Sequence, residues 1–86
     1  MPWVYVLISQ RNKKRYIGQT LKEPIIRLKE HNSGTNKWTR ENKPFILVHQ
    51  EWYQNKTEAI KRERFLKTGQ GRKWLDDQFP ASSMVE

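Results

Sequence analysis

The sequence predicts one small α/β domain. Its 86 residues suit a single domain, with little room for a second. Only 35% of the residues are apolar, but four Trp, three Tyr and three Phe supply large buried areas that a disordered basic chain would lack. Strand and helix patterns follow in the order strand, strand, helix, strand, helix, helix, which indicates a layered structure.

The first two elements are predicted to form a β-hairpin. Residues 3–8 are β-rich and continuously apolar, as in a strand covered on both faces. A polar and basic loop over 9–14 separates them from a short second strand at 15–18. Alternate side chains of the first strand would lie on opposite faces of the sheet: Trp3, Tyr5 and Leu7 on one, Val4, Val6 and Ile8 on the other.

A first helix is predicted from Pro24 to about Asn32. Proline suits the first turn because its missing N–H is not needed there, and Gly34 would end the helix. Residues 35–43 are polar and basic apart from Trp38, and are predicted to form a connector.

A third strand is predicted from Pro44 to about Tyr53, followed by two helices. Asn55 and Glu58 form a plausible capping pair for a helix that runs to about Thr68 and stops at Gly69. A short final helix would cover 72–79. The predicted domain therefore spans 1–79, and 80–86 are expected to form a disordered tail.

The chain is strongly basic, with 17 Lys and Arg against 9 Asp and Glu and a formal net charge of +8. Nucleic acid is the partner that this balance favours, because each neutralised phosphate releases condensed counterions. A solvated, solubilising surface is the alternative interpretation. Apolar runs are too short to span a bilayer, and no long helix pairs a basic face with a broad apolar one, so no membrane partner is expected.

Cysteine is absent, which excludes a disulfide scaffold and a Cys-ligated zinc site. The first residues have no charged region or cleavage signal of a secretory leader. A cytoplasmic location is therefore expected.

One carboxylate, Glu63, falls on the apolar stripe of a predicted helix, together with Ala59, Ile60 and Leu66. Burial of an unpaired carboxylate is expensive, so a cation must lie near it. That cation could be an arginine in a partly buried ion pair or a divalent metal ion, and the pattern alone leaves both open.

Several other polar residues could carry chemistry. Tyr5 and Tyr16 are ordinary sheet aromatics by type, yet hydroxyls on neighbouring strands can face one cleft. Arg27 could pair with Glu23 one helical turn away, or its planar guanidinium could bind two phosphoryl oxygens. His31 lies one turn further and could order water or relay a proton.

These residues resemble the motifs of the GIY-YIG endonuclease family from about Trp3 to Leu75. Only the central tyrosine of the family's first triplet is kept, at Tyr5. The resemblance is carried by four segments: Tyr16-Ile17-Gly18, Arg27 to Gly34, Glu58 to Glu63, and Phe65 to Lys73, which is similar to the tail of the small stand-alone bacterial members.

The resemblance implies a three-stranded, mostly antiparallel sheet flanked by helices. It also implies a metal-dependent endonuclease that hydrolyses DNA phosphodiester bonds in DNA repair or recombination. DNA is the expected partner, RNA remains open, and targeting by a partner protein remains open. The catalytic residues would be Tyr5, Tyr16, Arg27, His31 and Glu63, with Tyr16 favoured over Tyr5 as the base and Glu63 as ligand of one Mg²⁺ or Mn²⁺ ion.

A nucleic-acid-binding groove is predicted beside this site. Gly18 would let backbone or substrate approach Tyr16, and Trp38 is either a base-stacking platform or part of the core. The predicted binding residues are Gly18, Lys13, Lys14, Arg15, Lys29, Lys37, Arg40, Arg62, Lys67, Arg72 and Lys73.

Two other functions remain open from the residues alone: a non-catalytic nucleic-acid-binding module on a nuclease fold, and a protein-interaction adaptor with a Trp-rich surface. The catalytic interpretation makes a geometric prediction. Both hydroxyls, the Arg27 guanidinium and the Glu63 carboxylate should line one concave, basic surface. A carboxylate on the opposite face of the sheet from Tyr16, or one buried and paired only with a structural arginine, would overturn this geometry.

Overall fold

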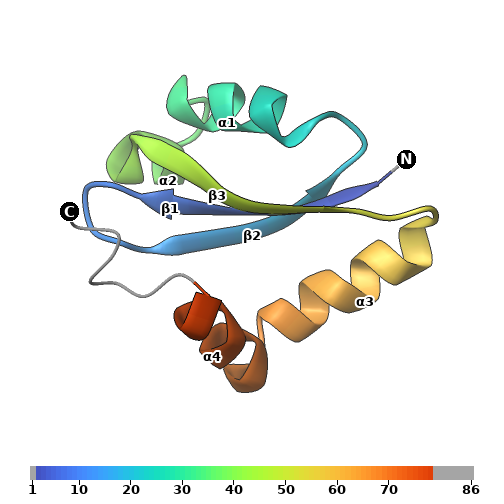
Figure 1. The fold of residues 1–86 in the computed structure, drawn as a ribbon. Coiled ribbons are helices and arrows are strands. Elements are labelled where there is room, and N and C mark those ends of the chain that lie inside the picture. Colours follow the sequence, from blue (N-terminus) through green and yellow to red (C-terminus); the bar gives the residue numbers. More distant parts are fainter. Residues whose placement is uncertain (1, 79–86) are drawn as a thin grey trace.

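The computed structural model describes residues 2–78, which form a three-stranded sheet between two helical layers (Figure 1). The predicted tail at 80–86 lies outside the described residues. The elements are β1 (Trp3–Ser9), β2 (Arg15–Thr20), α1 (Pro24–Asn32), α2 (Lys37–Asn42), β3 (Phe45–Trp52), α3 (Lys56–Leu66) and α4 (Gly69–Gln78).

The sheet has the strand order β2-β1-β3, and both pairings are antiparallel, which confirms the predicted fold class. β1 is the central strand, so it is covered on both faces and reads as a continuous apolar run. β2 and β3 are the two edges. In the β1–β2 hairpin, Tyr5 lies directly opposite Gly18, and the turn places Lys13 at φ 65°.

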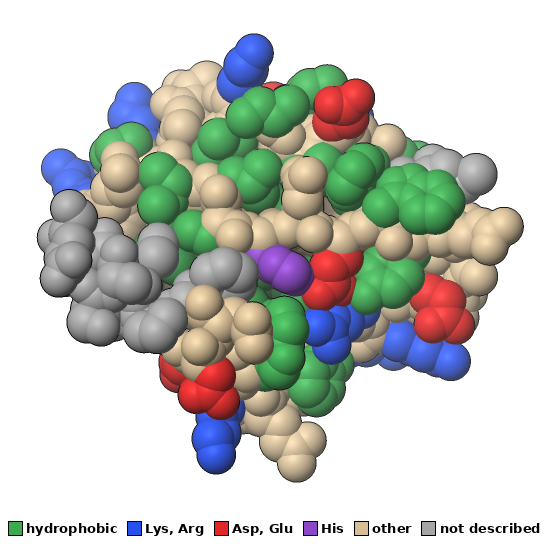
Figure 2. Space-filling model, in the orientation of Figure 1, with side chains coloured by type: hydrophobic (Ala, Val, Ile, Leu, Met, Phe, Trp, Pro, Cys, Tyr) green, Lys and Arg blue, Asp and Glu red, His purple; other side chains and the backbone are tan. Residues whose placement is uncertain are grey.

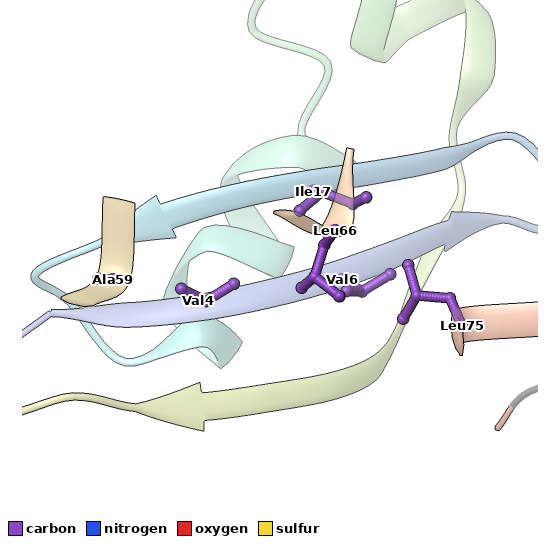
Figure 3. Packing of buried hydrophobic residues seen from close by; sticks show 6 residues of the cluster. All are labelled: Val4, Val6, Ile17, Ala59, Leu66 and Leu75. Atoms are coloured by element: carbon purple, nitrogen blue, oxygen red, sulfur yellow. The ribbon is translucent and has the colours of Figure 1, made fainter. Parts of the chain in front are cut away.

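Each face of the sheet packs against a different pair of helices. Figure 1 shows α1 and α2 on one face and α3 and α4 on the other. The predicted alternation of β1 is confirmed by two separate cores. Val4, Val6 and Ile17 pack with Ala59, Leu66 and Leu75 of α3 and α4 (Figure 3). Tyr5, Leu7 and Phe45 form the second core with Tyr16, Leu28 and Leu47.

The predicted connector over 35–43 is wrong, because α2 forms there. Asn36 caps the helix by accepting a hydrogen bond from the Thr39 N–H, and the Thr39 side chain binds back to the Asn36 backbone. This reciprocal pair satisfies two free N–H groups at the start of a short helix. Ser9 donates to the Asn42 carbonyl and fixes the end of α2 to the β1–β2 turn.

The boundary between the last two helices also differs from the prediction. α3 begins after Asn55, whose side chain accepts from the Glu58 N–H as predicted, but it ends at Leu66. Gly69, predicted as a stop, begins α4 instead. The Thr68 hydroxyl accepts from the Gly71 N–H, so threonine caps the new helix and allows α4 to fold back against α3.

Gly71 should be essential to this helix junction. A Cβ added at Gly71 would lie 2.0 Å from the Phe65 carbonyl oxygen and 2.5 Å from the Leu66 Cα, both backbone atoms. We expect Gly71→Ala to lower the free energy of unfolding by about 3 kcal/mol, because α3 and α4 must separate. Gly69→Ala is the matched control, since nothing lies within 4 Å of its added Cβ. Urea unfolding of both variants, monitored by circular dichroism, measures the difference. Equal midpoints would contradict an essential role of Gly71.

Candidate active site

Four of the predicted catalytic side chains meet on the α1 face of β1 and β2. The three rings lie against one another: the Tyr16 centroid is 6.0 Å from that of Tyr5 and 4.6 Å from that of His31, and the Tyr5 and His31 centroids are 6.3 Å apart. The Arg27 Nε donates a 3.5 Å hydrogen bond to the Tyr5 hydroxyl. Two strands and one helix therefore bring together residues that are far apart in the sequence.

Gly18 leaves the space that the tyrosines occupy. A Cβ at this position would lie 2.9 Å from the Tyr5 hydroxyl oxygen and 2.9 Å from Cε1 of Tyr16. The absent side chain thus accommodates the two rings, with Tyr5 directly across the hairpin. The glycine acts here by permitting this packing of the site.

Tyr5 is fully buried, and burial raises its pKa to about 12, although the hydrogen bond from Arg27 acts in the opposite direction. Its hydroxyl therefore stays protonated at neutral pH. Tyr16 is only half-buried, and its side chain lines the surface. Of the two phenols, Tyr16 is the one that water and substrate can reach.

Arg27 is held by a carboxylate that the sequence analysis did not assign. Its Nη1 donates to Glu30 Oε1 at 2.6 Å, one turn along α1, instead of pairing with Glu23. The hydrogen bond with Tyr5, followed by that with Glu30, raises the pKa of Arg27 above its ordinary value. The guanidinium is thus permanently charged and fixed between a phenol and a carboxylate.

His31 is buried, and its hydrogen bond defines the tautomer of its neutral form. Nδ1 lies 2.8 Å from the Arg27 carbonyl oxygen, which can only accept, so Nδ1 must carry a proton. Nε2 is then the acceptor of the neutral ring. The imidazole ring also contacts the Tyr16 ring, with centroids 4.6 Å apart.

Tyr16, Arg27 and His31 line a hollow of about 220 Å³ between α1 and α2, whereas Tyr5 lies behind them. α2 contributes Trp38, which stacks on Phe45 with centroids 5.4 Å apart and lies 5.6 Å from Tyr16. Trp38 is therefore both partly packed and partly exposed, which combines the two predicted alternatives. The hollow is lined by Tyr16, Arg27, Glu30, His31, Thr35, Asn36, Trp38 and Thr39.

Glu63 does not line this hollow, so the prediction of one shared concave surface is wrong. Glu63 belongs to α3, which covers the other face of the sheet. Its Oε1 accepts from Gln19 Nε2 at 3.2 Å, and its Oε2 pairs with Lys67 Nζ at 2.9 Å. The apolar stripe placed the carboxylate against the sheet correctly, but it did not determine which face α3 would cover.

The carboxylate nevertheless lies beside the same edge strand as Tyr16. Gln19, its partner, is three residues after Tyr16 in β2. A second hollow of about 340 Å³ is lined by both Tyr16 and Lys67, the residue that binds Glu63. Because β2 is an edge strand, side chains from both faces meet there without a further strand between them.

The residues at this edge fit a divalent ion only if substrate completes its ligands. Within residues 2–78, no group of three or more His, Cys, Asp or Glu side chains could hold a metal ion. Glu63 alone supplies one carboxylate. This is compatible with Mg²⁺, which often binds one or two carboxylates and takes its remaining ligands from water and phosphate.

Most of the predicted nucleic-acid-binding cations are exposed, and three of the predicted cations lie at the β2 edge. Arg15, Lys67 and Arg72 line the second hollow. Figure 2 shows the side on which β3 lies in front, where apolar and acidic side chains separate the cations. The remaining exposed predicted cations lie in the hairpin turn and on the helices: Lys13, Lys14, Lys29, Lys37, Arg40 and Lys73.

Arg62 is an exception, because its guanidinium is already engaged. Nε and Nη2 donate to the Glu51 carboxylate, with distances of 2.9 and 3.0 Å, and the group lies over the Phe65 and Trp74 rings. His49 and Tyr53 also contact Glu51. This placement argues against the predicted phosphate contact and favours a role in fixing α3 to β3.

We expect Arg62→Ala to lower the free energy of unfolding by about 1–2 kcal/mol without weakening DNA binding more than Arg64→Ala does. Arg64 is an exposed arginine of the same helix. Burial alone would raise the pKa of Glu51, but the hydrogen bonds from Arg62, His49 and Tyr53 hold it below its ordinary value of 4.5.

The stability contributed by Glu51 is therefore fully present at a pH above its ordinary pKa of 4.5. It is lost as the pH falls through the lower pKa that Glu51 has in the folded protein. The difference in stability between wild type and Arg62→Ala should shrink in acid. Thermal melts across pH and fluorescence anisotropy with labelled DNA measure both effects. If Arg62→Ala lost more DNA affinity than Arg64→Ala, the predicted contact between Arg62 and phosphate would be supported after all.

Sequence reasoning missed Glu30 and Gln19 as parts of the site. Glu30 was recoverable, because an Arg and a Glu three residues apart on a helix face each other. Gln19 alternates with Gly18 along β2 and so faces α3, but its partner depends on the sheet topology.

The chain belongs to the GIY-YIG family: residues 1–74 match the family model of the GIY-YIG catalytic domain. This is a nuclease domain, so its substrate is nucleic acid, and nucleases of the family generally use divalent metals. The resemblance found in the motifs is thereby confirmed.

The chain is similar to small bacterial proteins of the same type. It is 40% identical over 68 residues to the UPF0213 protein of Enterococcus faecalis, which covers 76% of this chain and 75% of the relative. It is 34% identical over 67 residues to the UPF0213 protein SH2523 of Staphylococcus haemolyticus, which covers 77% and 79%. No solved structure matches the chain at a significant level.

The structure contains no candidate membrane span among residues 2–78, since their helices are too short and polar to cross a bilayer.

Proposed function

We propose that this protein is a divalent-metal-dependent endonuclease that hydrolyses DNA phosphodiester bonds. The observation that carries the proposal is the hollow shared by Tyr16, Arg27 and His31, in a chain that belongs to a nuclease family. Pure binding of phosphate would not require a buried histidine and a protonated phenol behind an arginine. A role in DNA repair or recombination is part of the proposal, as is a cytoplasmic location.

In this mechanism Arg27 binds the phosphoryl oxygens and stabilises the charge that develops on them. Tyr5 and Glu30 keep its guanidinium in place, so the group does not have to be ordered when substrate binds. Tyr5 remains protonated and contributes a positioned hydrogen-bond donor.

Tyr16 acts toward the attacking water, and His31 Nε2 accepts the proton that Tyr16 cannot keep. A free phenol with a pKa of about 10 is a poor base at neutral pH, so a second acceptor is needed. The edge-on contact of His31 with the Tyr16 ring, with centroids 4.6 Å apart, supports this relay. The proton would thus pass into the buried side of the site.

Glu63 would hold the divalent ion, together with water and phosphate oxygens. A metal ion at this position would supply Lewis-acid stabilisation of negative charge on the phosphate or on the leaving oxygen. The Gln19 side chain would orient the carboxylate from the edge strand.

A plasmid-nicking assay tests the proposal directly. Highly purified protein should convert supercoiled DNA to open-circular DNA in Mg²⁺ or Mn²⁺, and EDTA should abolish the conversion. Protein that shifts DNA on a gel but never cleaves it with any divalent ion would instead be a binding module on a nuclease fold. A panel of duplex, single-stranded, flap and junction substrates, with RNA versions, would identify the substrate.

DNA affinity should fall steeply with salt and show little sequence preference. The exposed cations contact phosphates, so log K is expected to fall with log [salt] with a slope of about −0.9 for each phosphate neutralised. Anisotropy titrations between low and physiological salt measure the slope. An affinity that barely changes would contradict the phosphate groove, and negligible binding at physiological salt would favour the protein-adaptor alternative.

A further inference from the structure

The second hollow at the β2 edge is a basic surface beside the proposed catalytic tyrosine. We call it the β2–α4 hollow. Its volume is about 340 Å³, and Tyr16 lines both this hollow and the one that contains Arg27. It is lined by Arg15, Tyr16, Ile17, Lys67 and Arg72.

The three cations of this hollow differ in how strongly they are engaged. Arg15 pairs with Asp76 at 2.8 Å, and its guanidinium also donates to the Arg72 carbonyl. Within residues 2–78 no ion pair involves Arg72, so its charge is available to an anion. Lys67 pairs with Glu63 at 2.9 Å, and the lysine side chain is 55% exposed whereas the glutamate is 17% exposed.

We propose that the β2–α4 hollow binds the substrate phosphate next to the one that is cleaved. When this phosphate binds, the Lys67 ammonium group leaves Glu63 and contacts the phosphate instead. The carboxylate oxygen that Lys67 leaves then becomes available to the divalent ion. This inference rests on the proposed function. It assigns Lys67 as a positioning residue that links substrate binding to metal binding.

The arrangement of contacts favours this exchange. Lys67 is the C-cap residue of α3, so its backbone is anchored while its long side chain extends into solvent. An exposed lysine–carboxylate pair is weak, and a phosphate beside Arg72 would compete for the ammonium group. Gln19, in contrast, holds the other carboxylate oxygen from the sheet, so Glu63 keeps its orientation when Lys67 departs.

The exchange has one consequence for the free protein and one for the complex with substrate. In the free protein the Lys67 ammonium group is bonded to Glu63 Oε2, so it must weaken the binding of a divalent ion to that carboxylate. If substrate increases metal affinity by removing Lys67, metal must increase substrate affinity by the same factor.

The first consequence, that Lys67 weakens metal binding in the free protein, is tested by Mn²⁺ titration of the full chain without DNA. Electron paramagnetic resonance measures the binding. Lys67→Met should bind Mn²⁺ about threefold more tightly than Lys61→Met. Lys61 is the matched control, because it is an exposed lysine of the same helix and its removal changes the net charge equally. Glu63→Gln should lose the Mn²⁺ signal of this site.

The outcomes separate this inference from the proposed function. Equal Mn²⁺ affinities for Lys67→Met and Lys61→Met, with binding lost in Glu63→Gln, would overturn the role of Lys67 and leave the metal ligand in place. Unchanged binding in Glu63→Gln would overturn both the metal ligand and the exchange.

A second experiment tests the linkage without cleavage. The affinity for a labelled DNA duplex is measured by anisotropy in EDTA and in Ca²⁺, an ion with the same preference for oxygen ligands. Ca²⁺ should tighten DNA binding more in wild type and in Lys61→Met than in Lys67→Met. The same gain in all three proteins would overturn the exchange, as would undiminished binding by Lys67→Met in EDTA relative to Lys61→Met.

Discussion

Glu63→Gln is expected to reduce cleavage by about 100-fold or more while leaving the fold intact and DNA affinity in EDTA undiminished. The amide can still accept the hydrogen bond from Gln19, so the side chain should keep its place against β2. What it loses is the negative charge that a divalent ion requires. Single-turnover cleavage in Mg²⁺ and Mn²⁺, with DNA affinity measured in EDTA, separates these effects.

Glu58→Gln is the control for this experiment. Glu58 is an exposed carboxylate in the first turn of the same helix, so the variant removes the same charge away from the β2 edge. Its cleavage rate should match that of wild type. If Glu63→Gln also cleaves at the wild-type rate, the glutamate has no part in the reaction, which would agree with its position on the other face of the sheet.

Tyr16→Phe is expected to have the second large effect, with a fall in the cleavage rate of about 100-fold that higher pH does not restore. Tyr16 reaches both hollows, whereas Tyr5 is fully buried and its pKa is raised to about 12. Tyr5→Phe should therefore lose less activity. It should lower stability more, because the Arg27 Nε would lose its phenol partner.

Rates under single-turnover conditions and thermal melts of the two variants measure this contrast. The two proteins are matched, since each loses one hydroxyl from the same pair of rings. A greater loss of cleavage in Tyr5→Phe, at unchanged stability, would transfer the main role to Tyr5. Wild-type cleavage by Tyr16→Phe would remove the proposed relay through His31.

The local parts of this structure could be predicted because local rules decide them. Strand alternation placed Tyr5 on the other face of the sheet from Val4 and Val6, and the hairpin pairing placed Tyr5 directly across from Gly18. Pro24 and Gly34 marked α1 for conformational reasons that act within a few residues. The Tyr5–Tyr16–Arg27–His31 group follows from these elements and one packing contact between α1 and the sheet.

The unpredicted parts depend on choices that short patterns do not contain. α2 is a helix of 6 residues, whose cap by Asn36 and Thr39 matters more than any apolar periodicity. The apolar stripe of α3 indicated that it packs on a sheet, but β1 offers an apolar face on either side. Which face α3 covers is decided by the global packing, and this choice set the position of Glu63.

The position of the site at an edge strand limits how this protein can assemble. An unpaired strand edge is a template on which another chain can add a strand. The second hollow takes Arg15, Tyr16 and Ile17 from β2, so a strand added at this edge would obstruct access to it. Growth of the sheet that is compatible with activity is therefore confined to β3. A filament built by strand addition at both edges would be inactive.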